Sequence, residues 1–217
     1  MPGTLATLDP IEIPGHSPSG LGSPEHPMRI MTRRAAGLHP EPWDHEARAE
    51  VAAFFDALAP EWHTRTSPER DAVVADALAR GVGEGGDVCV ELGSGIGAYT
   101  PSLAERWRRV LAVEVSLEML RLAPTDVGHR VLADGSRLPL ATDAAAAVVL
   151  VNCFLFPAEV DRVLAPDGVV VWVNSSGAET PIHLPPADVV AALPGQWEGV
   201  ESTAGVGVWC VLRRSPG

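Results

Sequence analysis

The sequence predicts an α/β fold of the doubly wound type, in which a mostly parallel sheet carries helices on both faces. Short apolar runs alternate along the chain with segments of helical periodicity. These runs are almost free of polar residues, which is typical of parallel strands that are buried on both faces. The first run leads directly into three glycines at alternate positions, as in the first unit of a nucleotide-binding sheet.

The individual elements can be placed from their periodicity and their caps. Helices are expected over residues 44–58, with Asp44 as cap, and from the Ser67 cap onward. Parallel strands are expected over residues 88–92, 110–115, 130–133, 144–154 and 169–174. A hairpin over residues 197–213 closes the sheet. The expected order of this seven-stranded sheet is 3-2-1-4-5-7-6, with strand 7 antiparallel.

The chain length fits one domain with an N-terminal extension. There are 217 residues, of which 46% are hydrophobic, enough to bury a full core. Residues 1–40 are rich in Pro, Gly, Ser and His, so we expect them to form a flexible or loosely draped arm. We expect residues 41–217 to form the folded domain.

Charge and composition exclude several classes of partner. The net charge is −12, and all sixteen basic residues are arginine, so there is no basic face for a nucleic-acid backbone. No apolar run is long enough to span a membrane, and the N-terminus lacks the order of a secretion signal. We therefore expect a cytoplasmic protein with a small-molecule substrate and neither a nucleic-acid nor a membrane partner. No pattern indicates the oligomeric state.

No metal site is expected. Cys89, Cys153 and Cys210 each lie inside an apolar run without a second cysteine at ligand spacing. The seven histidines form no cluster at the spacing that metal sites require. The cysteines are therefore interpreted as buried core thiols.

Glu91 decides which nucleotide suits the glycine turn. Gly93-x-Gly95-x-x-Ala98 also matches a dinucleotide fingerprint, which is a weak signal alone. A carboxylate at Glu91 would face the two phosphates of a dinucleotide with like charge. S-adenosylmethionine carries an ammonium and a sulfonium instead, and a carboxylate stabilises both. A surface glutamate beside an ordinary glycine turn is the alternative interpretation.

Two more carboxylates follow at strand ends. Glu114 closes the second strand about twenty residues after the first glycine, where it can accept ribose hydroxyls of either cofactor. Asp134, followed by Gly135, closes the third strand. Strand ends also carry acidic residues as helix caps, but three in succession beside a glycine turn favour a nucleoside site.

The spacing Glu91-x-Gly93-x-Gly95-x-Gly97 resembles the first motif of class I S-adenosylmethionine-dependent methyltransferases. The resemblance spans about residues 87–174 and implies methyl transfer from this cofactor. It places the following residues at the cofactor: Glu91, Gly93, Ser94, Gly95, Gly97, Glu114, Val115, Met119, Asp134, Gly135 and Asn152. Within that set, Val115 and Met119 would pack against the adenosine, and Asp134 would accept its amino group.

The chain departs from that family after the fourth strand. Residues 152–157 replace the loop that usually touches the acceptor, so the acceptor stays unidentified. Asn152 either holds an acceptor amine or bonds neighbouring backbone, and the second role is the commoner one for such an Asn. Phe154 is a candidate acceptor contact. No catalytic base can be named.

Residues 61–65 are expected to form a lid over the methionine end of the cofactor. Trp62 would exclude water there, His63 would lie at the acceptor, and Arg65 would pair with the methionine carboxylate. The alternative is an interhelix turn with Trp62 in the core and Arg65 in solvent. Two other functions also stay open, namely an NAD(P)-dependent Rossmann oxidoreductase and a nucleoside-binding protein without turnover.

Overall fold

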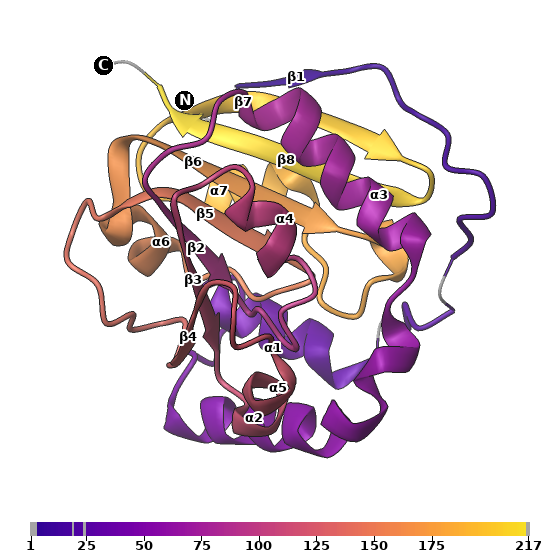
Figure 1. Ribbon diagram of the computed structural model, residues 1–217, viewed down its shortest axis with the longest axis vertical. Coiled ribbons are helices and arrows are strands. Elements are labelled where there is room, and N and C mark those ends of the chain that lie inside the picture. The colour runs from indigo at the N-terminus through magenta and orange to yellow at the C-terminus, as the bar shows by residue number, and fades with distance from the viewer. Residues whose placement is uncertain (1–3, 19, 24, 216–217) are drawn as a thin grey trace.

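The computed structural model describes residues 4–215, apart from residues 19 and 24. Within these residues, eight strands form one sheet in the order β1-β7-β8-β6-β5-β2-β3-β4 (Figure 1). The strands are β1 Thr4–Thr7, β2 Val88–Leu92, β3 Arg109–Glu114, β4 His129–Leu132, β5 Ala145–Val151, β6 Leu164–Asn174, β7 Trp197–Ala204 and β8 Gly207–Arg214.

The doubly wound α/β prediction is confirmed. Strands β2 to β8 follow the order expected from the sequence, and β8 pairs antiparallel with both β6 and β7. The sheet differs by the additional strand β1, which pairs in parallel with β7 from Thr4 opposite Glu198 to Thr7 opposite Glu201. This short strand is mostly exposed, so it carries no apolar alternation by which the sequence could reveal it.

Residues 1–40 were expected to form a flexible arm, but two parts of this segment, β1 and the helix α1, Pro27–Ala35, are regular structure that packs on the domain. Helix α1 buries Met28 and Met31 in the core, and the His26 ring accepts a hydrogen bond from the Met28 amide as its N-cap. Figure 1 shows the N-terminal segment running from β1 along one side of the molecule toward α1. A division of the chain near residue 41 stays a prediction.

Two of the remaining helices start at the caps that the sequence predicts. Asp44 accepts a hydrogen bond from the Ala47 amide at 2.9 Å, and Ser67 accepts one from the Arg70 amide. The other helical segments are α2 His45–Leu58, η1 Ala59–Arg65, α3 Pro68–Ala77, η2 Leu78–Val82, α4 Thr100–Ala104, α5 Leu117–Leu122, α6 Pro157–Val163, η3 Gly177–Glu179 and α7 Pro186–Ala192.

The two faces of the sheet bury two separate cores. Successive residues of β5 and β6 alternate between them, so Val148 and Val170 face α1, α6 and α7, whereas Val149 and Val171 face α3 and α4. Both faces of these strands are therefore covered, which explains their continuous apolar sequence.

The topology brings the carboxyl ends of four strands together. β2 lies between β3 and β5, so the chain leaves the sheet on either side of this central strand. Helices α2 and α5 pack against each other at this end, close to α1 (Figure 1). Ligands bind at such a switch point in open α/β sheets.

Candidate functional site

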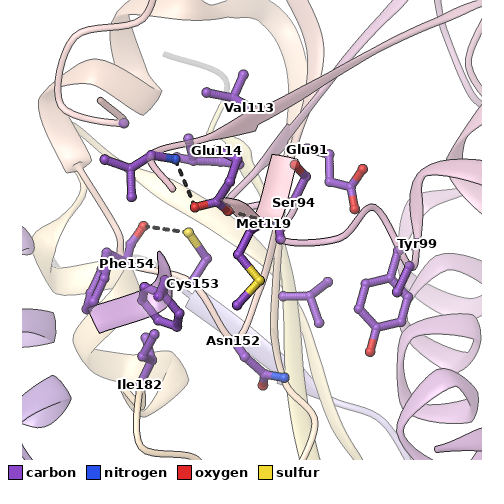
Figure 2. Close-up of a pocket in the computed structure, with 18 of the residues that line it drawn as sticks. Glu91, Ser94, Tyr99, Val113, Glu114, Met119, Asn152, Cys153, Phe154 and Ile182 are labelled. Atoms are coloured by element: carbon purple, nitrogen blue, oxygen red, sulfur yellow. Dashed lines mark hydrogen bonds between the residues drawn. The ribbon is translucent and has the colours of Figure 1, made fainter. Parts of the chain in front are cut away.

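A cavity opens at the carboxyl ends of β2, β3 and β5, and we call it the main cavity. Figure 2 shows Glu91, Ser94 and Tyr99 on one side of it, Cys153 and Phe154 on the other, and Glu114 with Met119 between them. All but one of the predicted cofactor residues line it, together with Trp62, Arg65 and Phe154; Gly97 is the exception.

The glycine turn is fixed by backbone geometry that only glycine adopts easily. Gly93 and Gly95 have φ angles of 69° and 56°. A Cβ atom at Gly93 would overlap the Cys153 sulfur. Gly95 donates its amide hydrogen to Glu114 at 2.8 Å, which ties the turn to the end of β3. Gly97 supports the turn from outside, with a φ of 71° and no surface on the main cavity.

Glu91 is a buried carboxylate with one unused oxygen. Its side chain is 3% exposed, and Oε2 accepts a hydrogen bond from the Thr100 hydroxyl. Oε1 has no partner among the described residues. Burial raises the pKa of Glu91 to about 7, and the nearby Glu114 charge acts in the same direction. A cation in the cavity would therefore find a carboxylate that lacks a counter-charge.

Glu114 is held by three backbone amides. Its oxygens accept hydrogen bonds from Gly95, Val115 and Ser116 at 2.8–2.9 Å. Burial raises the pKa of Glu114, whereas these three hydrogen bonds favour its charged form. A carboxylate offers about four acceptor directions, so about one is left for a ligand hydroxyl. The sequence-based expectation that Glu114 accepts both ribose hydroxyls therefore requires shared or rearranged bonds.

Asp134 lies at the end of the cavity that is lined by aromatic rings. It accepts hydrogen bonds from the Ser136 amide at 2.9 Å and from the Trp43 indole at 3.3 Å. The Trp43 ring lies 5.0 Å from Phe156 and 5.5 Å from Phe154, between centroids. Three rings beside a carboxylate form a slot that suits a flat base with an amino group.

The Asn152 side chain bonds to a neighbouring strand end, which is the commoner of the two roles expected for it. The residue has a φ of 49°, its Oδ1 accepts from the Ser175 amide, and its Nδ2 donates to the Ser175 hydroxyl, both at 2.8 Å. The amide thus joins the ends of β5 and β6 although it lines the main cavity. These two bonds fix the orientation of the side chain and use one of its two N–H groups, so a role at the acceptor stays a prediction.

The segment expected to form a lid lies over the glycine turn as a 3-10 helix. The Trp62 indole nitrogen would be 3.7 Å from a Cβ atom placed on Gly95. Trp62 also packs edge-on against Phe55, and the Arg65 guanidinium lies 5.9 Å from its ring centroid. Arg65 Nε is buried without a partner among the described residues. His63 is exposed and does not line the main cavity.

Several lining residues were not expected from the sequence, among them Trp43, Tyr99 and Arg70. Trp43 sits just before the first expected helix, and its aromatic character is the only signal it carries. Tyr99 follows the glycine turn, and burial raises the pKa of its hydroxyl to about 12. Arg70 reaches the cavity from the first turn of α3. Helical spacing does not distinguish such residues from ordinary surface or core positions.

The described residues contain neither a cluster of metal-binding side chains nor a helix that could cross a membrane. No group of three or more His, Cys, Asp or Glu residues is placed there to hold a metal ion. No helix among these residues is long and apolar enough to cross a membrane.

Comparisons with known proteins agree with this geometry. Residues 90–172 match the family model of a methyltransferase domain. Among solved structures, the DhpI–SAH complex is 22% identical with a TM-score of 0.62, covering 81% of this chain and 100% of that one. A Methanococcus maripaludis protein described as a candidate S-adenosyl-L-methionine-dependent methyltransferase is 15% identical with a TM-score of 0.56, covering 82% and 97%.

The remaining comparisons are weaker. A search of curated proteins returns no match. The match to the structure of a complex with the Haloferax volcanii Trm112 methyltransferase activator, 26% identical at a TM-score of 0.47, covers 55% of this chain and 59% of that one. Fold similarity at such identities does not transfer a substrate or a partner.

The fold and the strand-end site define a Rossmann-like domain that binds its ligand at the switch point. Residues 90–172 match a methyltransferase-domain model and the fold is that of class I S-adenosylmethionine-dependent methyltransferases, so the predicted resemblance is confirmed. The cofactor of this class is S-adenosylmethionine.

Proposed function

We propose that the protein transfers the methyl group of S-adenosylmethionine to a nucleophile on a small-molecule acceptor. The observation that carries this proposal is a set of buried polar atoms that lack partners in one cavity. Glu91, Ser94 and Arg65 all line the main cavity, and each has a buried polar side-chain atom, Oε1, Oγ and Nε respectively, without a hydrogen-bond partner among the described residues. Native structures rarely leave such groups unsatisfied, so a polar ligand is expected there.

The residues present fit the cofactor in charge and shape. Glu91 would pair with the ammonium group, and Arg65 would pair with the carboxylate through its planar fork. Glu114 would accept a ribose hydroxyl. Asp134 would accept the adenine amino group beside the Trp43, Phe154 and Phe156 rings; the Trp43 indole holds that position in the structure.

When bound, the cofactor supplies a methyl group on a sulfonium, and the electron pair of the broken carbon–sulfur bond returns to sulfur. The chain's own residues hold and align the reactants. Trp62 and Phe55 would exclude water above the glycine turn, and alignment in a dry site can supply most of the rate. The acceptor's proton has no assigned base among the residues that line the cavity.

The proposed location is the cytoplasm. Cys89, Cys153 and Cys210 are all buried and unpaired, which suits a reducing compartment. The main cavity has about 1030 Å³ of empty space, which is in the size range of small-molecule sites and supports a small-molecule acceptor.

The test is incubation with methyl-labelled S-adenosylmethionine and a small-molecule cell extract, followed by mass spectrometry. The proposal predicts labelled low-mass products together with S-adenosylhomocysteine, and a strong loss of both in Glu114→Ala. Cofactor binding without any S-adenosylhomocysteine formation would favour a nucleoside-binding protein instead. Binding of NADH in place of S-adenosylmethionine would favour an oxidoreductase.

A further inference from the structure

A second cavity, here called the side chamber, adjoins the main cavity. The residues that both cavities share are Phe55, Trp62, Arg65, Arg70, Asn152 and Ile182. The rest of the side-chamber wall comes from Leu21, His26 and Met28, from Phe54 and Leu58 of α2, and from Thr180 and Pro181. A molecule in the side chamber would therefore lie next to the proposed cofactor site, where an acceptor has to be.

The walls of the side chamber are largely apolar and aromatic. Phe54 packs edge-on against Phe55 at 5.4 Å, and Phe55 packs edge-on against Trp62 at 5.8 Å, between centroids. Met28 and Leu58 extend this surface. Such a wall suits a ring or a short hydrocarbon body.

The charge of the side chamber is opposite to that of the main cavity. Glu91, Glu114 and Asp134 line the main cavity, whereas no carboxylate among the described residues lines the side chamber. Arg65 and Arg70 line both. In a protein of net charge −12, a cavity lined by two arginines and no acid favours an anionic ligand locally.

Arg70 has no counter-charge among the described residues. Its guanidinium donates to the Arg65 carbonyl oxygen and, at 3.3 Å, to the Ser176 hydroxyl, both of which are neutral. No carboxylate in the described part of the chain lies within ion-pair distance of Arg70 or Arg65. The single carboxylate of the cofactor needs only one arginine, and we assign Arg65 to it because the Arg65 guanidinium lies 5.9 Å from the ring centroid of Trp62, which lies over Gly95.

We infer that the acceptor is an organic anion whose apolar body fills the side chamber and whose carboxylate or phosphonate pairs with Arg70. This inference rests on the proposed function, since it assigns Arg65 to the cofactor. The guanidinium fork matches either anion through two parallel hydrogen bonds.

The test uses protein saturated with S-adenosylhomocysteine, so that the cofactor carboxylate already occupies its own site. Phenylacetate, benzylphosphonate and neutral phenylacetamide are titrated by calorimetry. At least one of the two anions should bind about tenfold or more tightly than the amide, as expected for a charge-assisted pair. The two anionic probes distinguish a carboxylate from a phosphonate acceptor.

Arg70→Gln should abolish the preference for the anion. Arg106→Gln is the matched control, because Arg106 also donates to a backbone carbonyl, that of Gly83, and it lines neither cavity. This control should keep the preference. Arg70→Lys retains the positive charge but not the two parallel N–H donors of the guanidinium, so it should keep part of the preference for the anion. This variant replaces Arg70→Gln in the test if Arg70→Gln does not fold.

Equal affinity for both anions and the amide in the wild type would overturn the inference, and so would a preference that survives in Arg70→Gln. The titration with S-adenosylhomocysteine separates the two proposals. Absence of its binding would overturn the proposed function and this inference together. Normal binding without anion preference would overturn the inference alone.

Discussion

The main cavity and the side chamber are built from different parts of the chain. Strand ends and the turns after them carry the carboxylates of the main cavity, whereas the side chamber is walled by α2, η1, residues 180–182 and, from the N-terminal segment, Leu21, His26 and Met28. Carboxylates line only the main cavity, whereas Arg65 and Arg70 line both. The difference indicates that the sheet fixes the cofactor site, while the segments around it determine the acceptor.

The largest expected effect concerns the glycine turn. Gly95→Val should weaken S-adenosylhomocysteine binding by more than about 3 kcal/mol, because valine resists a φ of 56° and its side chain would enter the space below Trp62. Calorimetry measures the loss. Gly83→Val is the control, since Gly83 has a φ of 78° with open space around it and lies outside the main cavity. The Gly83→Val protein should be less stable than the wild type but should still bind S-adenosylhomocysteine. If Gly95→Val binds this ligand as tightly as the wild type does, the ligand does not lie at the glycine turn.

Glu91 should make the stability of the cofactor-free protein depend on pH. Its folded pKa of about 7 lies above its ordinary value of 4.5, so between these values the folded state binds more protons than the unfolded state. Stability should therefore fall as pH rises from about 5 to about 8, by roughly 2–3 kcal/mol from this group. Glu91→Gln should remove that contribution.

Urea unfolding at several pH values measures the difference between Glu91→Gln and the wild type. Glu105→Gln, at an exposed position after α4, controls for loss of one negative charge and should keep the wild-type slope. In the wild type, S-adenosylmethionine affinity should rise over the same pH range, because its ammonium favours the charged carboxylate. A pH slope shared by all three proteins would contradict the assignment of a cation site at Glu91.

Glu114→Ala should weaken S-adenosylmethionine binding by about 1–3 kcal/mol, since a ribose hydroxyl loses its charged acceptor. Asp134→Ala should cost less, because the aromatic slot around Trp43 remains. Calorimetry together with circular dichroism separates binding from folding, which matters because Glu114 also holds the glycine turn. If both variants fold and bind S-adenosylmethionine with unchanged affinity, the nucleoside does not bind in this part of the cavity.

The smallest effect belongs to the lid. Arg65→Ala should weaken S-adenosylmethionine by about 1–2 kcal/mol and methylthioadenosine hardly at all, because the latter lacks the carboxylate. Cofactor should also protect residues 60–70 from hydrogen exchange. Equal weakening of both ligands would return residues 61–65 to the role of an interhelix turn.

The contrast between the two cavities also explains how much of the site could be predicted from the sequence. Parallel strands that are buried on both faces read as apolar runs, and their carboxyl ends meet at one edge whatever surrounds them, so Glu91, Glu114 and Asp134 could be placed together. The contribution of Trp43 and Arg70 depends on the packing of segments far apart in sequence. Neither residue has a spacing that separates it from ordinary core or surface positions.

Strand β1 and helix α1 were missed for related reasons. β1 is short and mostly exposed, and α1 begins at a histidine cap followed by proline in a segment rich in Pro and Gly. His63 shows the opposite error, since its chemistry suggested a site contact while the turn of η1 directs it to solvent. Sequence chemistry alone does not give the side on which a short helix presents a residue.

The most direct test of the cofactor site is calorimetric titration of the wild-type protein with S-adenosylhomocysteine and, separately, with NADH. The buried Glu91 and Glu114 carboxylates should admit the first ligand, whose methionine end is cationic at its amine, and repel the pyrophosphate of the second. The expected result is saturable binding of S-adenosylhomocysteine and none of NADH. Tight binding of NADH without binding of S-adenosylhomocysteine would contradict the assignment.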